Sequence, residues 1–289
     1  ERILVGEARS ALVELIALRD HRALLSAQEQ NAKQLTEFIE VSAAKGEASP
    51  LDAGIAFLNA SGLGNLTRQI EIKAQLAEAR LKPLLGMNPA GKLTVSATLE
   101  EPAMPPMNVT SYRRPDLEAA RLRATSAGAE TDLARSTRLD DFEAGVFAGV
   151  GREEDAPTGT HSEQIVGFRL KIPLGENPAA AGSEVAATAR YERLQIGASA
   201  MEQIANSETH AAYAEMKQWQ LLATQMKNEI LPLAVAQIEK TKTAYQGAEV
   251  PLQDVLRAEE QKLSLETAYL EAVRDFHLAK TKYLTATAQ

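Results

Sequence analysis

The sequence contains no cysteine, and only 4% of its residues are aromatic. Without thiols the chain has neither a disulfide framework nor a cysteine nucleophile. No apolar run approaches the length of a membrane-spanning helix, about 20 residues. The formal charge of −8 argues against nucleic acid as a partner, because the phosphate backbone attracts basic surfaces. What remains is an alanine-rich chain, and that composition favours long helices that pack closely.

Long helices are predicted wherever apolar residues recur at helical spacing. They cover residues 1–45, 50–85, 178–246 and 251–285, and a shorter helix opens at Arg114-Pro115-Asp116-Leu117. Gly46 ends the first helix and Pro50 opens the second, as glycine and proline usually do. The stripe of the first helix consists of Leu4, Ala8, Ala11, Leu12, Leu15, Leu18, Leu25, Leu35, Phe38 and Ile39.

Glycine and proline also predict where these helices are interrupted. Gly62 and Gly64 are expected to cause a kink or bulge in the second helix, and Pro232 a kink in the long third one. Residues 87–113 carry four prolines, at 89, 102, 105 and 106. We expect this segment to be a linker with a short strand at 93–99.

A β-hairpin is predicted at residues 141–174, because the period changes there from helical to alternating. Phe142 to Gly151 and Val166 to Ile172 alternate, and the acidic stretch 152–163 between them indicates a solvated loop. In the second strand one face is apolar (Val166, Phe168, Leu170, Ile172), and the other carries Gly167, Arg169 and Lys171. Both a soluble sheet and a membrane barrel use such strands, so alternation alone leaves the two open.

The chain contains an internal repeat of about 200 residues. Residues 47–52 match residues 249–254, and Leu76-Ala77 matches Leu278-Ala279. The repeat divides the chain into an incomplete first copy (1–86), a linker (87–113) and a second copy (114–289). By comparison with the second copy, we expect about 90 residues of the first copy before Glu1.

Residues for enzyme chemistry are not grouped in the sequence. The four histidines are far apart and have no metal-ligand spacing. Met104 and Met107 are interpreted as incidental to a proline-rich linker, and Trp219 as a packing residue. Gly145, Gly149 and Gly151 lie in a strand that another strand follows, so they do not form a nucleotide-binding loop. We therefore predict no catalytic site, no metal site and no cofactor.

The order of these motifs resembles the TolC family of outer-membrane efflux proteins. The resemblance rests on 114–120 at the start of the second copy, on Val166 to Leu174, and on the two helical turns at 46–52 and 244–256. Ser49-Pro50 at the first turn is similar to the heavy-metal branch of that family. The chain departs from the family pattern at Gly247, which comes one place early, and in offering one hairpin where the family has two.

The resemblance implies a mainly α fold of long antiparallel helices, an α-barrel protomer with one β-hairpin that contributes to a membrane β-barrel. It implies that the full-length form is a homotrimeric exit duct in the outer membrane with a periplasmic extension, joined through a periplasmic adaptor to an inner-membrane resistance-nodulation-division pump. The family barrel takes four strands from each of three protomers and this chain offers two, so we expect that this chain alone does not form the complete pore. Metal ions or small toxic compounds would be its substrates. The alternative is a soluble helical scaffold, a coiled-coil interaction protein without channel activity.

The resemblance also assigns roles to residues. Gly46, Glu47, Ser49, Pro50, Gly247, Glu249 and Pro251 would form the periplasmic tips where an adaptor docks. Asp52 and Asp254 would place charge around the aperture, although helix N-terminal carboxylates also simply stabilise the helix dipole. Val166, Phe168, Leu170 and Ile172 would face outer-membrane lipid. Arg169 and Lys171 would face the lumen.

Overall fold

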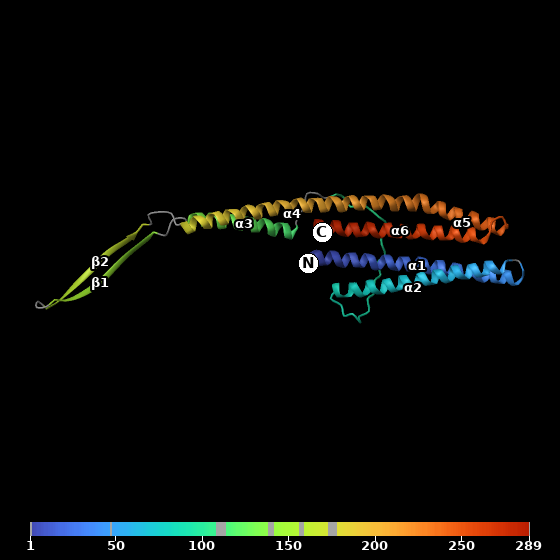
Figure 1. Ribbon diagram of the computed structural model, residues 1–289, viewed down its shortest axis with the longest axis horizontal. Coiled ribbons are helices and arrows are strands. Elements are labelled where there is room, and N and C mark those ends of the chain that lie inside the picture. Colours follow the sequence, from blue (N-terminus) through green and yellow to red (C-terminus); the bar gives the residue numbers. More distant parts are fainter. Residues whose placement is uncertain are drawn as a thin grey trace. The chain divides into compact units, whose positions relative to one another are not determined.

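The computed structural model describes residues 2–46, 48–107, 114–137, 142–155, 159–172 and 178–288. Its elements are α1 (Arg2–Ala44), α2 (Pro50–Leu84), α3 (Pro115–Ser136), β1 (Glu143–Asp155), β2 (Gly159–Lys171), α4 (Pro178–Gln225), the π-helix η1 (Met226–Ile230), α5 (Leu231–Gln246) and α6 (Leu252–Thr287) (Figure 1). The predicted fold class, long antiparallel helices with one hairpin, is confirmed. Glu47, Pro173 and Leu174 lie outside the described residues.

The chain forms two compact units. The helical unit comprises Glu1–Tyr112 and Ala205–Gln289, and the hairpin unit comprises Arg113–Ile204. This division differs from the repeat boundaries, because the linker packs on helices of both copies, and the end of α4 and α6 belong to the same unit as α1 and α2. The repeat boundaries themselves remain a prediction about the sequence.

Two helical hairpins, α1 with α2 and α5 with α6, make up most of the helical unit (Figure 1). They meet where α1 packs against α6. Near one end of this seam Gly6 lies so close to α6 that a β-carbon there would be 2.5 Å from Thr285 Oγ1. At the other end Ile39 and Ala56 bury Leu252 and Leu256. Leu15, Leu25 and Ile39 of the predicted stripe are buried, whereas Leu4 and Phe38 are exposed.

Helix α2 continues through Gly62 and Gly64 without interruption, so the predicted bulge is absent. Gly64 instead admits a neighbour, because a β-carbon at this position would lie 3.1 Å from the carboxylate of Glu29 on α1. That carboxylate forms an ion pair with Lys33 at 2.6 Å. The missing side chain at Gly64 of α2 thus makes room for a carboxylate of α1.

At Pro232, where a kink was predicted, the structure has a π-helical turn. Residues 226–230 form η1, which ends two positions before the proline, and the Leu231 amide donates to the Met226 carbonyl five residues back. Proline has no N–H to continue the α-helical ladder and crowds the preceding turn. One wider turn accommodates this defect, and the helical direction continues into α5.

The linker does not contain the predicted strand. In its described part, residues 87–107, the backbone is irregular, and we call this segment the strap. Leu93 and Val95 pack against the α1–α2 core of Leu15, Ala77 and Leu81. Leu99 packs on α6 and Ala223, and Met104 packs on the core of Ala212, Met216, Phe276, Ala279 and Tyr283. The strap therefore serves as shared packing for both helical hairpins.

Helix side chains supply the hydrogen bonds that a neighbouring strand would otherwise give the strap. Arg19 donates to the Val95 carbonyl at 3.1 Å, His277 Nε2 to the Glu100 carbonyl at 2.8 Å, and Gln220 to the Pro102 carbonyl at 3.4 Å. The prolines among residues 102–106 have no N–H to offer a sheet. The alternation at 93–99 reflects packing on helices, and sequence alternation alone does not distinguish this from strand pairing.

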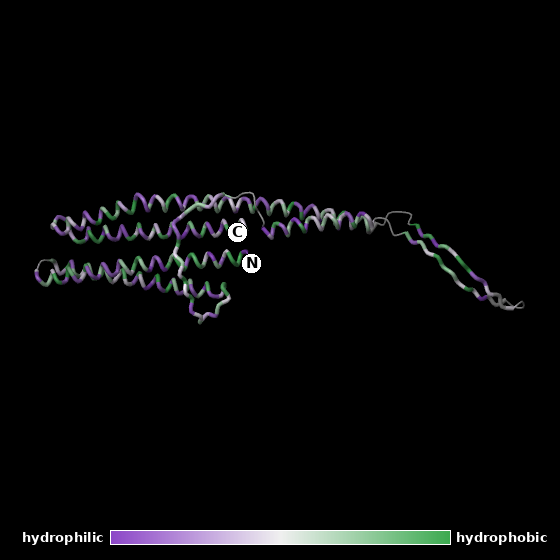
Figure 2. The backbone as a smooth tube through the Cα atoms, turned by 180° about the vertical axis from the view of Figure 1, so that it is seen from behind, coloured by the Kyte–Doolittle hydropathy of each residue, from purple (hydrophilic) through white to green (hydrophobic). Residues whose placement is uncertain are grey.

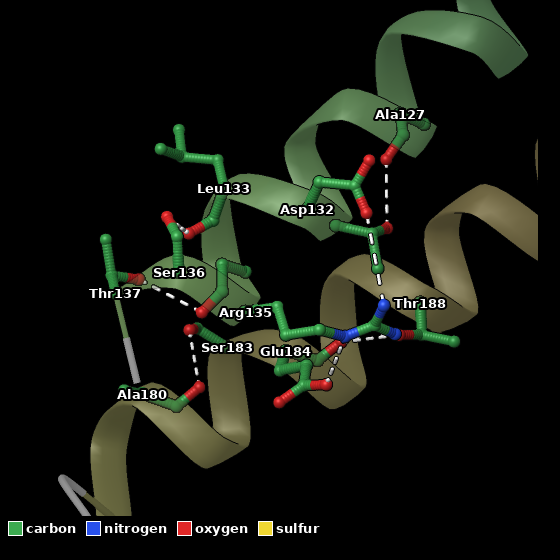
Figure 3. Close-up of polar contacts among 12 residues, drawn as sticks. Ala127, Asp132, Leu133, Arg135, Ser136, Thr137, Ala180, Ser183, Glu184 and Thr188 are labelled. Carbon is green, nitrogen blue, oxygen red and sulfur yellow. Dashed lines mark hydrogen bonds and ion pairs between the residues drawn. The ribbon is translucent and has the colours of Figure 1, made fainter. Parts of the chain in front are cut away.

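In the hairpin unit, α3 packs against the first part of α4 through small residues and ion pairs. Gly128 lies in ordinary contact with the Tyr191 ring, and Ala124, Ala127 and Thr131 are buried. Arg135 of α3 forms an ion pair with Glu184 of α4 at 3.0 Å, drawn as a dashed line in Figure 3. Arg190 pairs with Glu130 and Arg121 with Glu202 in the same way. Exposed ion pairs contribute little to the free energy of folding, so these pairs mainly fix the register of the two helices.

His277 gives a test of the contact between strap and helices. Burial lowers the pKa of this half-buried histidine below its usual value, and Lys280 acts in the same direction, while the Glu100 carbonyl and its carboxylate oppose the shift. A lowered folded-state pKa means that the unfolded chain takes up the proton first as the pH falls through about 6.5. The free energy of unfolding should therefore decrease from pH 7.5 to 5.5.

We expect His277→Gln to reduce this pH dependence, because an amide still donates to the Glu100 carbonyl and does not titrate. Urea unfolding followed by circular dichroism at both pH values measures it. His210→Gln is the matched control, because His210 is exposed on α4. An unchanged pH dependence in His277→Gln would contradict the assignment.

Candidate functional site: the helical tips and the hairpin faces

The first tip joins α1 to α2. Gly46 has a positive φ of 78°, a left-handed conformation that glycine adopts without strain, and its amide donates to the Ala43 carbonyl. The Ser49 side chain caps α2 by accepting from the Leu51 amide at 3.2 Å, and Pro50 occupies the first turn. The sequence signals for a helix end and a new helix start thus act as predicted.

The second tip, between α5 and α6, repeats this geometry 202 positions later. Ala248 takes the place of Gly46, with a φ of 58°, and the Glu249 amide donates to the Ala244 carbonyl at 2.9 Å. Pro251 takes the place of Ser49 as the capping residue, but offers no side-chain hydrogen bond. Gly247 has an ordinary φ of −78°. The early glycine noted in the sequence therefore leaves an alanine in the strained position.

Asp52 and Asp254 occupy equivalent places in the first turns of α2 and α6. Asp254 forms an ion pair with Arg257 at 3.7 Å. Asp52 is partly buried, and its negative charge acts on Tyr245 at the end of α5. Burial first, and then this charge, raise the pKa of the Tyr245 phenol above its usual value. Tyr245 is a tip residue that the sequence interpretation missed, because only the fold brings it near Asp52.

Between the tips lies a shared apolar cluster. Leu252, directly after the second tip, is 1% exposed and packs with Ile39, Ala56 and Leu256. Its counterpart in the first copy, 202 positions earlier, is the exposed Pro50, and the next residue, Leu51, is 70% exposed. The two tips are therefore held side by side in the helical unit, and the role of their carboxylates as an aperture charge remains a prediction.

The hairpin lies within the predicted range 141–174, but its strands are longer than predicted. Thirteen residues of β1 pair with thirteen of β2, in register from Glu143 opposite Lys171 to Asp155 opposite Gly159. Most of the stretch 152–163, predicted to be a loop, is therefore paired strand. Strand pairing uses backbone atoms, so charged side chains do not prevent it. Apolar alternation in the sequence therefore does not reveal these strand residues. Figure 2 shows the hydrophilic half of the hairpin next to the turn and the hydrophobic half away from it.

One face of the hydrophobic half is apolar on both strands. The register places Val146 opposite Phe168 and Ala148 opposite Val166. Val146 is 79% exposed and Phe168 66%. In the second strand this face contains Val166, Phe168 and Leu170 as predicted, and Ile172 follows directly after the strand. Within the part of the chain that the structure describes, no neighbour buries these side chains, so the apolar face is exposed.

The opposite face carries organised polar groups. Lys171 forms an ion pair with Glu143, directly across the hairpin, at 3.2 Å. The guanidinium of Arg169 lies 5.8 Å from the centre of the Phe147 ring. The alternation had placed Phe147 on this face. What sequence could not show is that its ring covers Gly167, where a β-carbon would be 2.4 Å from the ring.

A cavity of about 460 Å³ lies between α1, α2 and α6, away from the tip residues. Its walls include His21, Lys73 and Arg274, with Glu271 and Asp275. Burial is the main cause that lowers the pKa of His21, and Lys73 and Arg274 add to it while Glu271 opposes it. Arg274 forms an ion pair with Asp275 at 2.8 Å. This mixed-charge cavity was not anticipated, because its walls come from three helices far apart in sequence.

Of the helices in the described ranges, none is long and apolar enough to cross a membrane. Within the same ranges, no three histidine, aspartate or glutamate side chains are grouped so that they could hold a metal ion. Met104 packs in the core beside Met216 and Phe276, as expected of a structural linker residue.

Comparison with known proteins identifies the fold. No protein-family model matches the chain, and no curated protein matches it in sequence. Among solved structures, the outer-membrane channel OprN has a TM-score of 0.77 at 18% identity, over 99% of this chain and 66% of that one. The outer membrane protein VceC of Vibrio cholerae has a TM-score of 0.75 at 20% identity, over 99% and 70%.

CusC, whose structures concern transmembrane channel formation, has a TM-score of 0.76 at 18% identity, over 99% of this chain and 68% of that one. The chain thus spans about two thirds of the length of these structures, 66% in the case of OprN. It shares with these outer-membrane channels the fold of long antiparallel helices with a β-hairpin.

The tip geometry predicts the effect of moving one glycine. Ala248→Gly should raise the free energy of unfolding by about 0.5–1 kcal/mol, because an L-residue with a positive φ is strained and glycine is not. Gly46→Ala should lower it by a similar amount. Gly247→Ala is the matched control, since its φ is −78° and it should not destabilise. Urea denaturation measures all three, and a loss of stability in Ala248→Gly would show that the left-handed turn is assigned wrongly.

Proposed function

We propose that this chain is a protomer of an outer-membrane channel, a passive exit duct in a tripartite efflux system. The observation that carries the proposal is the open apolar face of the hairpin, where Val146 and Phe168 are 79% and 66% exposed. A lone two-stranded hairpin is marginal in water and needs a surface to cover such a face. The fold shared with outer-membrane channels supports lipid as the proposed covering surface.

Lipid imposes a second requirement, which concerns the backbone. The outer edges of β1 and β2 have no partner strand in this two-stranded sheet. Unpaired N–H and C=O groups are very costly in a bilayer, so strands span it only as closed barrels. Copies of the hairpin must therefore pair edge to edge. The proposed assembly is a homotrimer, whose closed barrel sits in the outer membrane and whose helices extend into the periplasm.

The tips are the proposed docking site for a periplasmic adaptor, which links the duct to an inner-membrane pump of the resistance-nodulation-division type. Three copies would repeat Asp52 and Asp254 around one aperture, and rings of charge bias which ions enter. Carboxylates attract cations, and Ser49-Pro50 resembles the heavy-metal branch of the TolC family. Metal ions are therefore the proposed substrates, with small toxic compounds as the other class.

Liposome flotation tests whether the apolar face touches lipid. We expect the protein to float with outer-membrane lipid vesicles, and Ala148→Lys to reduce the bound fraction strongly. Ala148 lies opposite Val166 on the apolar face, and a lysine facing the bilayer midplane costs about 2–4 kcal/mol.

Gly149→Lys is the matched control. It adds the same charge one residue later, on the opposite face, where a β-carbon meets nothing within 4 Å. Its flotation should equal that of the unchanged protein. Equal loss in both variants would contradict a face-specific contact with lipid. Absence of flotation together with a monomeric state in detergent-free buffer would instead indicate a soluble helical scaffold.

A further inference from the structure

The cavity between α1, α2 and α6 has α1 in its middle and the other two helices at its sides. Helix α1 packs against both α2 and α6 and lies between them (Figure 1). The cavity volume of about 460 Å³ is typical of small-molecule sites, which measure about 300–1,000 Å³. Its lining contains Leu18 of α1, Leu76 of α2 and Leu278 of α6, and Leu76 is 56% exposed. The cavity therefore offers apolar surface to a small organic molecule.

The charges in the lining cancel. Three lining side chains are negative and three are positive: Glu14, Glu271 and Asp275, and Lys73, Arg80 and Arg274. Burial is the main cause that lowers the pKa of His21, so this lining histidine is neutral near pH 7. A ligand with a single charge therefore gains no net attraction from the cavity as a whole.

The side formed by α2 is positive. Lys73 and Arg80 are two turns apart on one face of this helix, about 10 Å along its axis. Both are exposed, and among the described residues neither forms an ion pair. Glu71 and Glu78, the carboxylates beside them on α2, pair with other cations, each at 3.1 Å.

The side formed by α6 carries unpaired negative charge. Asp275 neutralises Arg274 at 2.8 Å. Glu271, one turn earlier, forms no ion pair within the described part of the chain. Its charge nevertheless acts on His21 and on Arg274, and Glu14 of α1 also acts on Arg274. Opposite charges thus remain unpaired on the two sides of the cavity.

The internal repeat places opposite charges at equivalent positions. Lys73 and Leu76 of α2 correspond to Asp275 and Leu278 of α6, 202 positions later. All four side chains line the cavity. The leucine is the same in both copies, whereas the charge is reversed. The cavity therefore joins similar apolar contacts with charges of opposite sign.

We propose that this cavity binds a small zwitterion with an apolar body, such as a short apolar peptide with free ends. The carboxylate of the ligand pairs with Lys73 and Arg80 of α2, and its ammonium group pairs with Glu271 of α6. Its apolar body covers Leu76 and Leu278. Charge-assisted hydrogen bonds are stronger than neutral ones, so both ends contribute to binding. This binding site goes beyond the proposed duct and does not require a channel to form.

An apolar groove with incidental charges makes a different prediction. Binding would then follow the apolar body alone. Blocking either end of a peptide would leave its affinity unchanged or increase it, because a blocked end has no charge to remove from water. Ligands with the same body and different charges therefore separate the two explanations.

The experiment is isothermal titration calorimetry of the full chain in a non-ionic detergent at about pH 7, where a peptide amine is mostly protonated. The probes are leucyl-leucine, leucyl-leucine amide, which is only a cation, and N-acetyl-leucyl-leucine, which is only an anion. We expect leucyl-leucine to bind about tenfold more tightly than either blocked peptide, as the loss of one charge-assisted contact predicts.

Two variants assign the ends of the ligand. The double variant Lys73→Gln with Arg80→Gln should weaken leucyl-leucine about tenfold without weakening the amide, which has no carboxylate. Glu271→Gln should weaken leucyl-leucine without weakening the acetylated peptide, which has no ammonium group. The matched control, Lys217→Gln with Lys240→Gln, removes two exposed cations outside the cavity and should leave all three affinities unchanged.

Two results would overturn the inference. One is the absence of leucyl-leucine binding, and the other is equal binding of the three peptides. Neither result bears on the proposed duct, which liposome flotation tests separately. Conversely, binding of leucyl-leucine with the expected charge dependence would support the cavity site even if the protein did not bind lipid.

Discussion

The close approach of α1 and α6 is the contact on which the helical unit depends. It joins the two helical hairpins, from Gly6 against Thr285 at one end to Ile39 against Leu252 at the other. Long helices approach this closely only where one side chain is very small, and glycine, alanine and threonine supply such positions along the seam. Because the seam fixes both hairpins, it also places the two tips together and gives the strap a continuous surface to cross. A bulky residue at Gly6 would therefore disturb features far beyond its own position.

Local signals were sufficient to predict the helices and the alternation of the hairpin. Gly46, Ser49 and Pro50 end one helix and begin the next through backbone conformation and capping, which are properties of a few consecutive residues. The strap was predicted wrongly because Leu93, Val95 and Leu99 find their partners on helices, and alternation does not specify the partner. The stretch 152–163 was predicted as a loop because its charge suggested solvent, although strand pairing uses backbone atoms. Tyr245 beside Asp52 and the ring of Phe147 over Gly167 depend on tertiary structure, so no local pattern could show them.

Exposed apolar side chains recur on the helices as well as on the hairpin. On α2, Leu51 and Leu58 are both 70% exposed and Ile72 is 57% exposed. Their spacing, multiples of seven residues, places them along one side of the helix, as in helices that pack against a further helix. The proposed trimer would cover this stripe with a neighbouring copy, just as lipid would cover the hairpin face. One assembly thus accounts for two kinds of apolar surface that a single chain leaves in water.

The strap receives its hydrogen bonds through its own backbone carbonyls, while the donors are side chains of Arg19, Gln220 and His277 on the helices. Every residue type has a carbonyl, so mutations at positions 95, 100 and 102 preserve these acceptors. Evolutionary drift in the strap is therefore constrained mainly by the few apolar residues that pack inward. A segment of this kind can keep its backbone path over the helices while most of its residues are substituted. For such a segment, relationships between proteins are easier to detect from the backbone path than from the amino-acid sequence.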